Sequence, residues 1–256
     1  MDYFIADPAG NITAFILGQP DPAAAEKLLQ AEPRVEQVAF LRRPVNGGHI
    51  KCDMAGGEFC GNACRAAAFY YARREGIAFD CTVKVEMSGT DGHPVTVAVD
   101  PQKGRAFAAM PLPERTLTVN WEGHVIPAVI FHGIIHFIIP GNLSGRISLT
   151  KQKMHQLCAN LKTAALGVMF LSPDLRLKPV VWVDQVGTLI WESSCGSGSV
   201  ACAWWLSRDL KQGWREYCFS QPGGELEIIV NRTSEGSELQ MGGAVSLLDD
   251  PLWRKL

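Results

Sequence analysis

Apolar and polar residues alternate over the first fifty positions in a way that predicts short strands. The stretch "YFIADPAGNITAFIL" is predicted to form a strand, a Gly-Asn turn and a second strand, and strands are also predicted for "QVAFLRR" and "GHIKCDM". Between them, "DPAAAEKLLQA" has Asp at the N-cap position, Pro at the first helical position and apolar residues with a helical period. This segment is therefore predicted to form a helix.

The remaining pattern contains a weak internal repeat. A glycine-rich motif around Cys60 precedes a predicted helix at about 62–75, which Gly76 closes, and two predicted strands, "TVKVEMS" and "PVTVAVD". A similar motif around Cys195, 135 positions later, precedes a predicted helix at about 197–210, closed near Gly213, and the predicted strands "ELEIIVN" and "ELQMGGAVSL". This order indicates an α+β fold of two pseudo-repeated halves.

The halves are predicted to span residues 1–117, joined by 247–256, and residues 118–246. The proline-containing segment "MPLPERTLTVNWEGHVIP" is the predicted crossover between them. After it come a predicted buried strand pair, "AVIFHGIIHFIIP", a helix in "SLTKQKMHQLCANLKT" and a strand at about 166–171. Interfaces between halves commonly hold small-molecule sites, so a site between the two is expected.

Composition excludes several classes of partner. The 256 residues carry a formal net charge of −2, and basic runs do not exceed two residues, so neither nucleic acid nor an anionic membrane is an expected partner. The longest apolar run is too short to span a bilayer, and no secretory signal is recognisable. Eight cysteines without an export signal favour reduced thiols and a cytoplasmic location.

Cys60 and Cys195 both stand where a helix is predicted to begin. Unpaired N–H groups and the positive end of the helix dipole are expected to point at each sulfur and lower its pKa. The same N–H groups suit a carboxylate, and glycines beside each cysteine allow a ligand to approach the backbone closely. Each half is therefore predicted to offer one thiol and one anion-binding helix start.

Two such thiols facing one α-carbon suit racemisation of an amino acid. A thiolate on one face removes the α-proton while a thiol on the other face delivers a proton, and the dipoles aimed at the carboxylate stabilise the developing carbanion. This scheme requires neither a metal nor pyridoxal phosphate, so no cofactor is expected. The partner is then a small amino acid.

The motifs "EFCGNACRA", "ESSCGSGSVACA" and "AGNITAFIL" resemble, in order and spacing, those of the diaminopimelate epimerase family, the cofactor-independent two-cysteine racemases. The resemblance implies two halves that are each a curved sheet around a central helix, with the active site in the cleft between them. It also implies a catalytic acid/base pair and a set of substrate-binding residues: Cys60 and Cys195 as the pair, and Asn11, Gly61, Asn62, Glu192, Gly196 and Ser197 around the substrate. A homodimer is a further option, since dimers are common in that family.

Departures from the family pattern bear on the substrate. The stretch "DQVGTLIWESSC" lacks the arginine that holds the distal carboxylate of diaminopimelate, and "GIIHF" keeps only His136 of an Asn-Pro-His motif. The chain is more similar to the divergent branch that includes histidine racemases of metallophore biosynthesis. Histidine, or another amino acid with a single carboxylate, is therefore the predicted substrate, and diaminopimelate the alternative.

Other functions stay open at the level of sequence. A cysteine hydrolase or transferase could use Cys195, but it needs a histidine base and leaves Cys60 unexplained. A non-catalytic amino-acid-binding protein would need neither thiol. Cys64 and Cys202 are predicted to pack in the core, because their spacings from the motif cysteines miss the usual zinc pattern and no metal is expected. Glu58 and His136 are each either pocket or structural residues.

Overall fold

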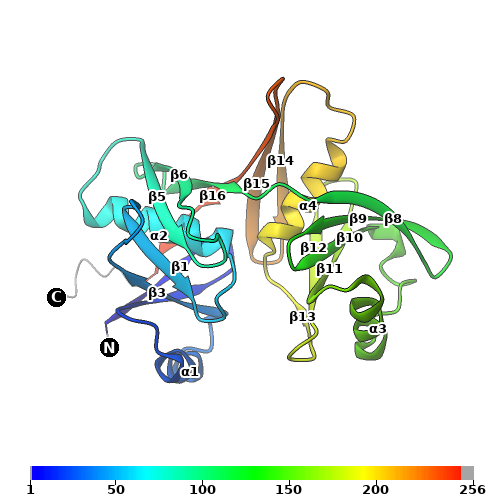
Figure 1. Cartoon of the computed structure of the whole chain (residues 1–256), viewed down its shortest axis with the longest axis horizontal. Coiled ribbons are helices and arrows are strands. Elements are labelled where there is room, and N and C mark those ends of the chain that lie inside the picture. Colours follow the sequence, from blue (N-terminus) through cyan, green and yellow to red (C-terminus); the bar gives the residue numbers. More distant parts are fainter. Residues whose placement is uncertain (1, 249–256) are drawn as a thin grey trace. The chain divides into compact units, whose positions relative to one another are not determined.

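The computed structural model describes residues 2–248 of the protein, which divide into two compact units (Figure 1). The first unit is formed by the residues up to Ala109 together with the described residues from Gln240 onward. The second unit runs from Met110 to Leu239. Each unit has its own sheet, helices and hydrophobic core, so each is described by itself.

The chain changes unit a few residues before the predicted boundaries, which divided it into 1–117 and 118–246. Most of 247–256, predicted to join the first half, lies outside the described residues. Leu247 is described, and it pairs with Ala6 in the first unit.

The first unit is a mixed sheet on which two helices, α1 and α2, are packed. In order across the sheet its strands are β16 (Ser237–Ala244), β7 (Arg105–Met110), β6 (Val95–Asp100), β5 (Cys81–Met87), β4 (Ile50–Met54), β3 (Gln37–Arg42), β2 (Thr13–Leu17), β1 (Tyr3–Asp7) and β17 (Ser246–Leu247). The alanine-rich helix α2 (Gly61–Arg74) contacts β4, β5 and β6, while α1 (Pro22–Ala31) packs against β3 over a separate core. The two helices therefore belong to different hydrophobic cores of this unit.

Small side chains allow α2 to be buried along most of its length. Alanines at 63, 66, 67, 68 and 72 are inaccessible to solvent, so the backbone of the helix comes close to the strands. The helix ends at Arg74, and Gly76 follows with a positive φ of 67°, as its predicted role at the helix terminus requires. The predicted helix at 62–75 is thus confirmed.

The second unit contains a six-stranded sheet and a two-stranded ribbon. The sheet order is β13 (Thr188–Trp191), β12 (Leu177–Val183), β11 (Ala165–Leu171), β10 (Ile134–Pro140), β9 (His124–Phe131) and β8 (Arg115–Trp121). The helix α3 (Lys151–Leu161) shares the core of one face, and α4 (Gly196–Leu206) contacts β9, β10 and β11 as well as the ribbon of β14 (Gly213–Gln221) and β15 (Gly224–Arg232). A short 3₁₀ helix, η1 (Gly141–Leu143), follows β10.

Two predictions about elements of the second unit were wrong, and one strand was missed. The segment predicted as a crossover mostly forms the hairpin β8–β9, and the chain passes from the first unit into the second at Met110–Glu114. The two strands predicted after α4 are present as β15 and β16, joined by a turn in which the N–H of Thr233 donates to the carbonyl of Gly236 at 2.7 Å. The strand β14 before them was missed, because it is largely exposed and its charged residues obscure the apolar alternation. The helix α4 was predicted to end at about residue 210, but it ends at Leu206. Ser207 is its C-cap residue, and the hydroxyl of Ser207 forms a hydrogen bond with the hydroxyl of Tyr217.

A buried arginine ties the first unit together. The guanidinium of Arg65, on α2, is inaccessible to solvent and donates to the carbonyls of Pro8, Ala106 and Gly243 at 3.2 to 3.3 Å. It also donates to Oδ1 of Asn62 at 3.0 Å. One side chain thus links the helix to the β1–β2 loop, to β7 and to β16, because a buried charge needs this many acceptors.

Replacing this guanidinium should destabilise the protein strongly. We expect Arg65→Leu to lower the free energy of unfolding by about 3 kcal/mol or more, since four buried acceptors lose their donor. The matched control is Arg73→Leu on the exposed face of the same helix, with an expected change within about 0.5 kcal/mol. Urea unfolding followed by circular dichroism measures both, and equal midpoints for the two variants would contradict this role for Arg65.

Candidate active site

Cys60 is the N-cap residue of α2, as predicted. Its backbone is extended (φ −129°, ψ 107°), and its Sγ accepts a hydrogen bond from the N–H of Ala63 at 3.4 Å. Gly61 and Asn62 form the first turn, where backbone N–H groups have no partner within the helix. The local sequence produces this geometry because a small polarisable side chain at the N-cap can accept from the third helical N–H in place of Ser or Asp.

An amide network surrounds this thiol. Nε2 of Gln37 lies 2.8 Å from Oδ1 of Asn11 and from Oγ1 of Thr13, and 3.3 Å from the Cys60 sulfur. Nδ2 of Asn62 donates to the same Asn11 oxygen at 3.3 Å, and the Cys60 thiol lies 3.8 Å from it. The structure therefore brings the predicted residues Asn11, Cys60 and Asn62 together.

Gln37 and Thr13 are site residues that sequence reasoning missed. Gln37 opens β3 and Thr13 opens β2, and the parallel register of these strands places the two directly opposite each other. Neither lies in a recognisable motif. A polar residue at the start of an otherwise apolar strand was the available signal, and it is too common to identify a site without the strand register.

The pKa of the Cys60 thiol is raised rather than lowered, contrary to the sequence-based expectation. Burial of the thiol is the main cause, and the negative charge of Glu58 adds to it. Hydrogen bonds from Ala63 N–H and Gln37 act in the opposite direction but do not outweigh the loss of solvation. Glu58 itself is exposed, and its carbonyl accepts from the hydroxyl of Ser88 at 2.7 Å.

Cys195 occupies the equivalent place in the second unit. It is the N-cap of α4 with nearly the same backbone angles as Cys60 (φ −120°, ψ 107°), and it is buried. Its own N–H donates to Oε1 of Gln221 at 2.8 Å, Gln221 donates to the hydroxyl of Ser199, and that hydroxyl donates to the carbonyl of Cys195 at 2.7 Å. This closed ring of hydrogen bonds fixes the backbone of Cys195.

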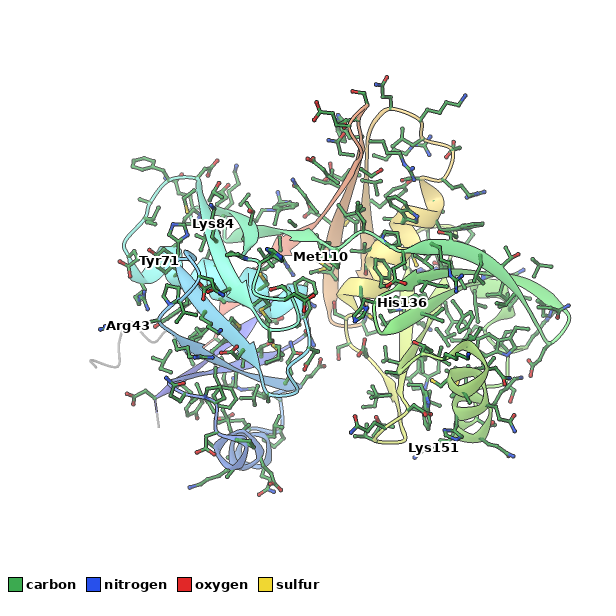
Figure 2. All side chains as sticks on the ribbon, viewed as in Figure 1. Arg43, Tyr71, Lys84, Met110, His136 and Lys151 are labelled. Atoms are coloured by element: carbon green, nitrogen blue, oxygen red, sulfur yellow. The ribbon has the colours of Figure 1, made fainter. Side chains whose placement is uncertain are left out.

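A serine and a histidine stand beside the second thiol. Oγ of Ser197 lies 3.8 Å from Sγ of Cys195 and 3.0 Å from Nε2 of His136 on β10, which is labelled in Figure 2. His136 is fully buried, and burial lowers its pKa to about 3, so the ring is neutral at physiological pH. Gly167 makes room for it, since a Cβ there would lie 2.0 Å from Nδ1 of the ring.

The thiol of Cys195 also has a raised pKa. Burial is the largest cause, followed by the charge of Glu192 and a hydrogen bond with its side chain, while the N–H of Gly198 and the hydroxyl of Ser197 oppose them. Gly198 must lack a side chain, because a Cβ there would lie 2.1 Å from the sulfur of Met169. The structure therefore groups the predicted residues Glu192, Cys195 and Ser197, with Gly196 in the same helical turn.

The other cysteine predictions concern packing and metals. Cys64 and Cys202 are completely buried within α2 and α4, and burial raises both thiol pKa values far above the ordinary range. Within residues 2–248, no three His, Cys, Asp or Glu side chains are grouped so that they could hold a metal ion. The helices in this part of the chain are also too short or too polar to cross a membrane.

The fold is that of known epimerases. The solved structure of a predicted epimerase from Pseudomonas aeruginosa superposes with a TM-score of 0.72 over 96% of both chains, at 17% sequence identity. This likeness confirms the predicted α+β class of epimerase fold.

Sequence relationships narrow this class to one family. The family model described as histidine racemase CntK N-terminal domain matches residues 1–249, and the chain belongs to that family. A histidine racemase of Fusobacterium nucleatum is 30% identical, with 97% of this chain and 94% of the relative covered, and one of Staphylococcus aureus is 25% identical, with 94% and 92% covered. The predicted resemblance to the histidine racemase branch and the predicted isomerase class are confirmed.

The influence of Glu192 on the second thiol can be measured directly. Glu192→Gln replaces a carboxylate, whose charge and hydrogen bond both raise the pKa of Cys195, with a neutral amide, so the thiolate should form at lower pH. We expect the rate of iodoacetamide alkylation of Cys195, followed by peptide mass spectrometry from pH 6 to 10, to rise several-fold at a given pH below the plateau. The control is Glu225→Gln. Glu225 lies near Cys218, so this variant should leave the alkylation profile of Cys195 unchanged. A profile that stays the same in Glu192→Gln would refute this assignment.

Proposed function

We propose that this protein is a cofactor-independent racemase that interconverts L- and D-histidine, with Cys60 and Cys195 as the two bases. The observation that carries the proposal is the repetition of one arrangement: a cysteine at the N-cap of a buried helix, with matching backbone angles, in both units of a histidine racemase family member. A racemase must treat the two faces of one carbon alike, and a repeated half-site supplies one base for each face.

The first turns of the two helices would hold the substrate carboxylate. Backbone N–H groups of Gly61 and Asn62, and of Gly196 and Ser197, have no acceptors within their helices and form two anion sites. As the α-proton leaves, negative charge spreads from the α-carbon onto the carboxylate. The hydrogen bonds from these N–H groups to the carboxylate then become stronger, which lowers the energy of the transition state.

The proton transfers balance between the two sulfurs. One thiolate takes the α-proton and becomes a thiol, while the opposite thiol delivers its proton to the other face and becomes a thiolate. The reverse reaction starts from that state, so each enantiomer is accepted by a different protonation state of the enzyme. Racemisation therefore consumes no other reactant, and the side chain of the substrate takes no part in the transfers.

Substrate binding is needed to stabilise a thiolate. Burial raises the pKa of both thiols, so the resting site is largely protonated near neutral pH. The substrate ammonium would donate hydrogen bonds to Glu192 and to Oδ1 of Asn11. Its positive charge offsets the negative charge of Glu192 and favours the thiolate. We place this reaction in the cytoplasm, where the thiols stay reduced and D-histidine can supply metallophore biosynthesis.

Exchange of the α-proton in D2O tests both the reaction and the substrate. Followed by NMR, wild type should exchange the α-proton of L- and D-histidine with inversion and leave diaminopimelate unchanged. Cys60→Ser and Cys195→Ser should each lose racemisation by at least about 100-fold, because a hydroxyl is a far weaker acid than a thiol and is hardly ever ionised to act as the base. Cys218→Ser, at an exposed thiol outside the site, is the matched control and should keep full activity.

The outcomes separate the competing interpretations. Exchange on diaminopimelate alone would make the protein an epimerase of that substrate, and full activity in either active-site serine variant would refute the two-base mechanism. Circular dichroism of the variants distinguishes lost chemistry from lost structure.

A further inference from the structure

One face of the six-stranded sheet in the second unit carries a row of residues that lie directly opposite one another. His136 on β10 lies opposite Gly167 on β11. Gly167 lies opposite Val181 on β12, and Val181 lies opposite Ile190 on β13. Opposite residues place their side chains on the same face of a sheet. The row therefore runs along one face from the buried histidine to β13, the strand at the end of the sheet (Figure 1).

This face also holds the second thiol. Glu192 comes two positions after Ile190 and continues the pairing, since its N–H donates to a carbonyl of β12 at 3.0 Å, so the two side chains point to the same face. The Glu192 carboxylate acts on the thiol of Cys195 through its charge and a hydrogen bond. At the other end of the row, His136 forms its hydrogen bond with Ser197. The surroundings of Cys195 therefore border the row at both ends.

The part of the row near β13 is apolar and accessible. Ile190 is 54% exposed and Val181 is half-buried. Trp191, the next residue after Ile190, points to the opposite face, where its ring stacks on that of Phe170 with a centroid distance of 5.8 Å. Ile190 and Val181 therefore present an accessible apolar surface beside the Glu192 carboxylate.

We propose that Ile190 and Val181 form the subsite for the side chain of the amino acid substrate, where they select a flat, uncharged ring such as imidazole. The assignment rests on the racemase function proposed above. In that reaction the first turn of α4 holds the substrate carboxylate and Glu192 holds the ammonium. The surface that adjoins Glu192 and is left for the side chain is then that of Ile190 and Val181.

One such subsite serves both enantiomers. As the α-proton leaves, the α-carbon becomes planar, and the carboxylate, the nitrogen and the side chain keep their directions while the hydrogen changes face. The two thiols must therefore lie on opposite faces of the carbon, but the side chain stays in one place. A side-chain subsite in the second unit alone is sufficient, and it need not be repeated in the first unit.

The same surface disfavours a second charged group on the substrate. Diaminopimelate would bring a distal carboxylate and ammonium against Ile190 and Val181, which offer no side-chain hydrogen bond in exchange for lost water. An imidazole ring is largely neutral above pH 7 and buries carbon atoms against these side chains. An apolar subsite therefore favours histidine over a substrate with a distal zwitterion.

Kinetic constants of variants at Ile190 test this subsite. Ile190→Ser should raise the KM for L- and D-histidine by about five-fold or more and change kcat by less than about two-fold, because it removes apolar contact and leaves both thiols in place. Ile190→Val keeps a branched apolar side chain and should raise KM by less than about two-fold. The matched control is Val186→Ser, at a 65% exposed residue in the turn between β12 and β13, with an unchanged KM.

Protection from alkylation measures binding without turnover. Without substrate, iodoacetamide should modify Cys195 at the same rate in wild type and in Ile190→Ser, which shows that the thiol itself is unchanged. The concentration of L-histidine that halves this rate should be higher in Ile190→Ser by the same factor as KM.

The outcomes distinguish a wrong subsite from a wrong function. Equal KM values in wild type and Ile190→Ser, or an equal rise of KM in Val186→Ser, would overturn the subsite and leave the racemase function intact. A wild type that neither exchanges the α-proton of histidine nor is protected by it would overturn the proposed function and the subsite with it.

Discussion

The first turn of a helix leaves backbone N–H groups without partners within the helix. In both units these donors surround the candidate cysteine, Cys60 or Cys195. In an exposed helix, water or a serine N-cap would satisfy those groups. Here the N-cap is a cysteine in each unit, so the sulfur lies among the donors, and Gly61 and Gly196 follow where a bulky side chain would cover them. A carboxylate is a ligand that suits such a turn, and the proposed binding of the substrate carboxylate rests on this.

Two opposing effects set the protonation state of the thiols. The helix start and nearby amides favour the thiolate, whereas burial and the carboxylates Glu58 and Glu192 favour the thiol, and burial dominates in both units. A site that keeps its thiols protonated at rest reacts slowly with oxidants and alkylating agents. In the proposed reaction, the positive charge of the bound substrate shifts this balance toward the thiolate.

The surroundings of the thiols are rigid for a common reason. Arg65 holds Asn62 through a hydrogen bond, and Gln221 with Ser199 holds the backbone of Cys195. His136 stays neutral and fills the space that Gly167 leaves open, so it supports Ser197 by a hydrogen bond that does not change with pH over the physiological range. Each arrangement satisfies buried polar atoms and, as a consequence, limits the positions that the reactive groups can adopt.

The sequence by itself determined the α+β class, the helix starts at Cys60 and Cys195 and the likeness to two-cysteine racemases, because these depend on local patterns and short motifs. It could not show β14, whose charged residues hide the strand period. Nor could it show that Gln37 and Thr13 border the Cys60 motif, or that Arg65 of that motif is buried against distant backbone carbonyls. Those contacts depend on strand register and on which helix face is buried. The direction of the pKa shifts also came only from the tertiary structure: a helix start is visible in the sequence, but the loss of solvation that outweighs it comes from residues distant along the chain.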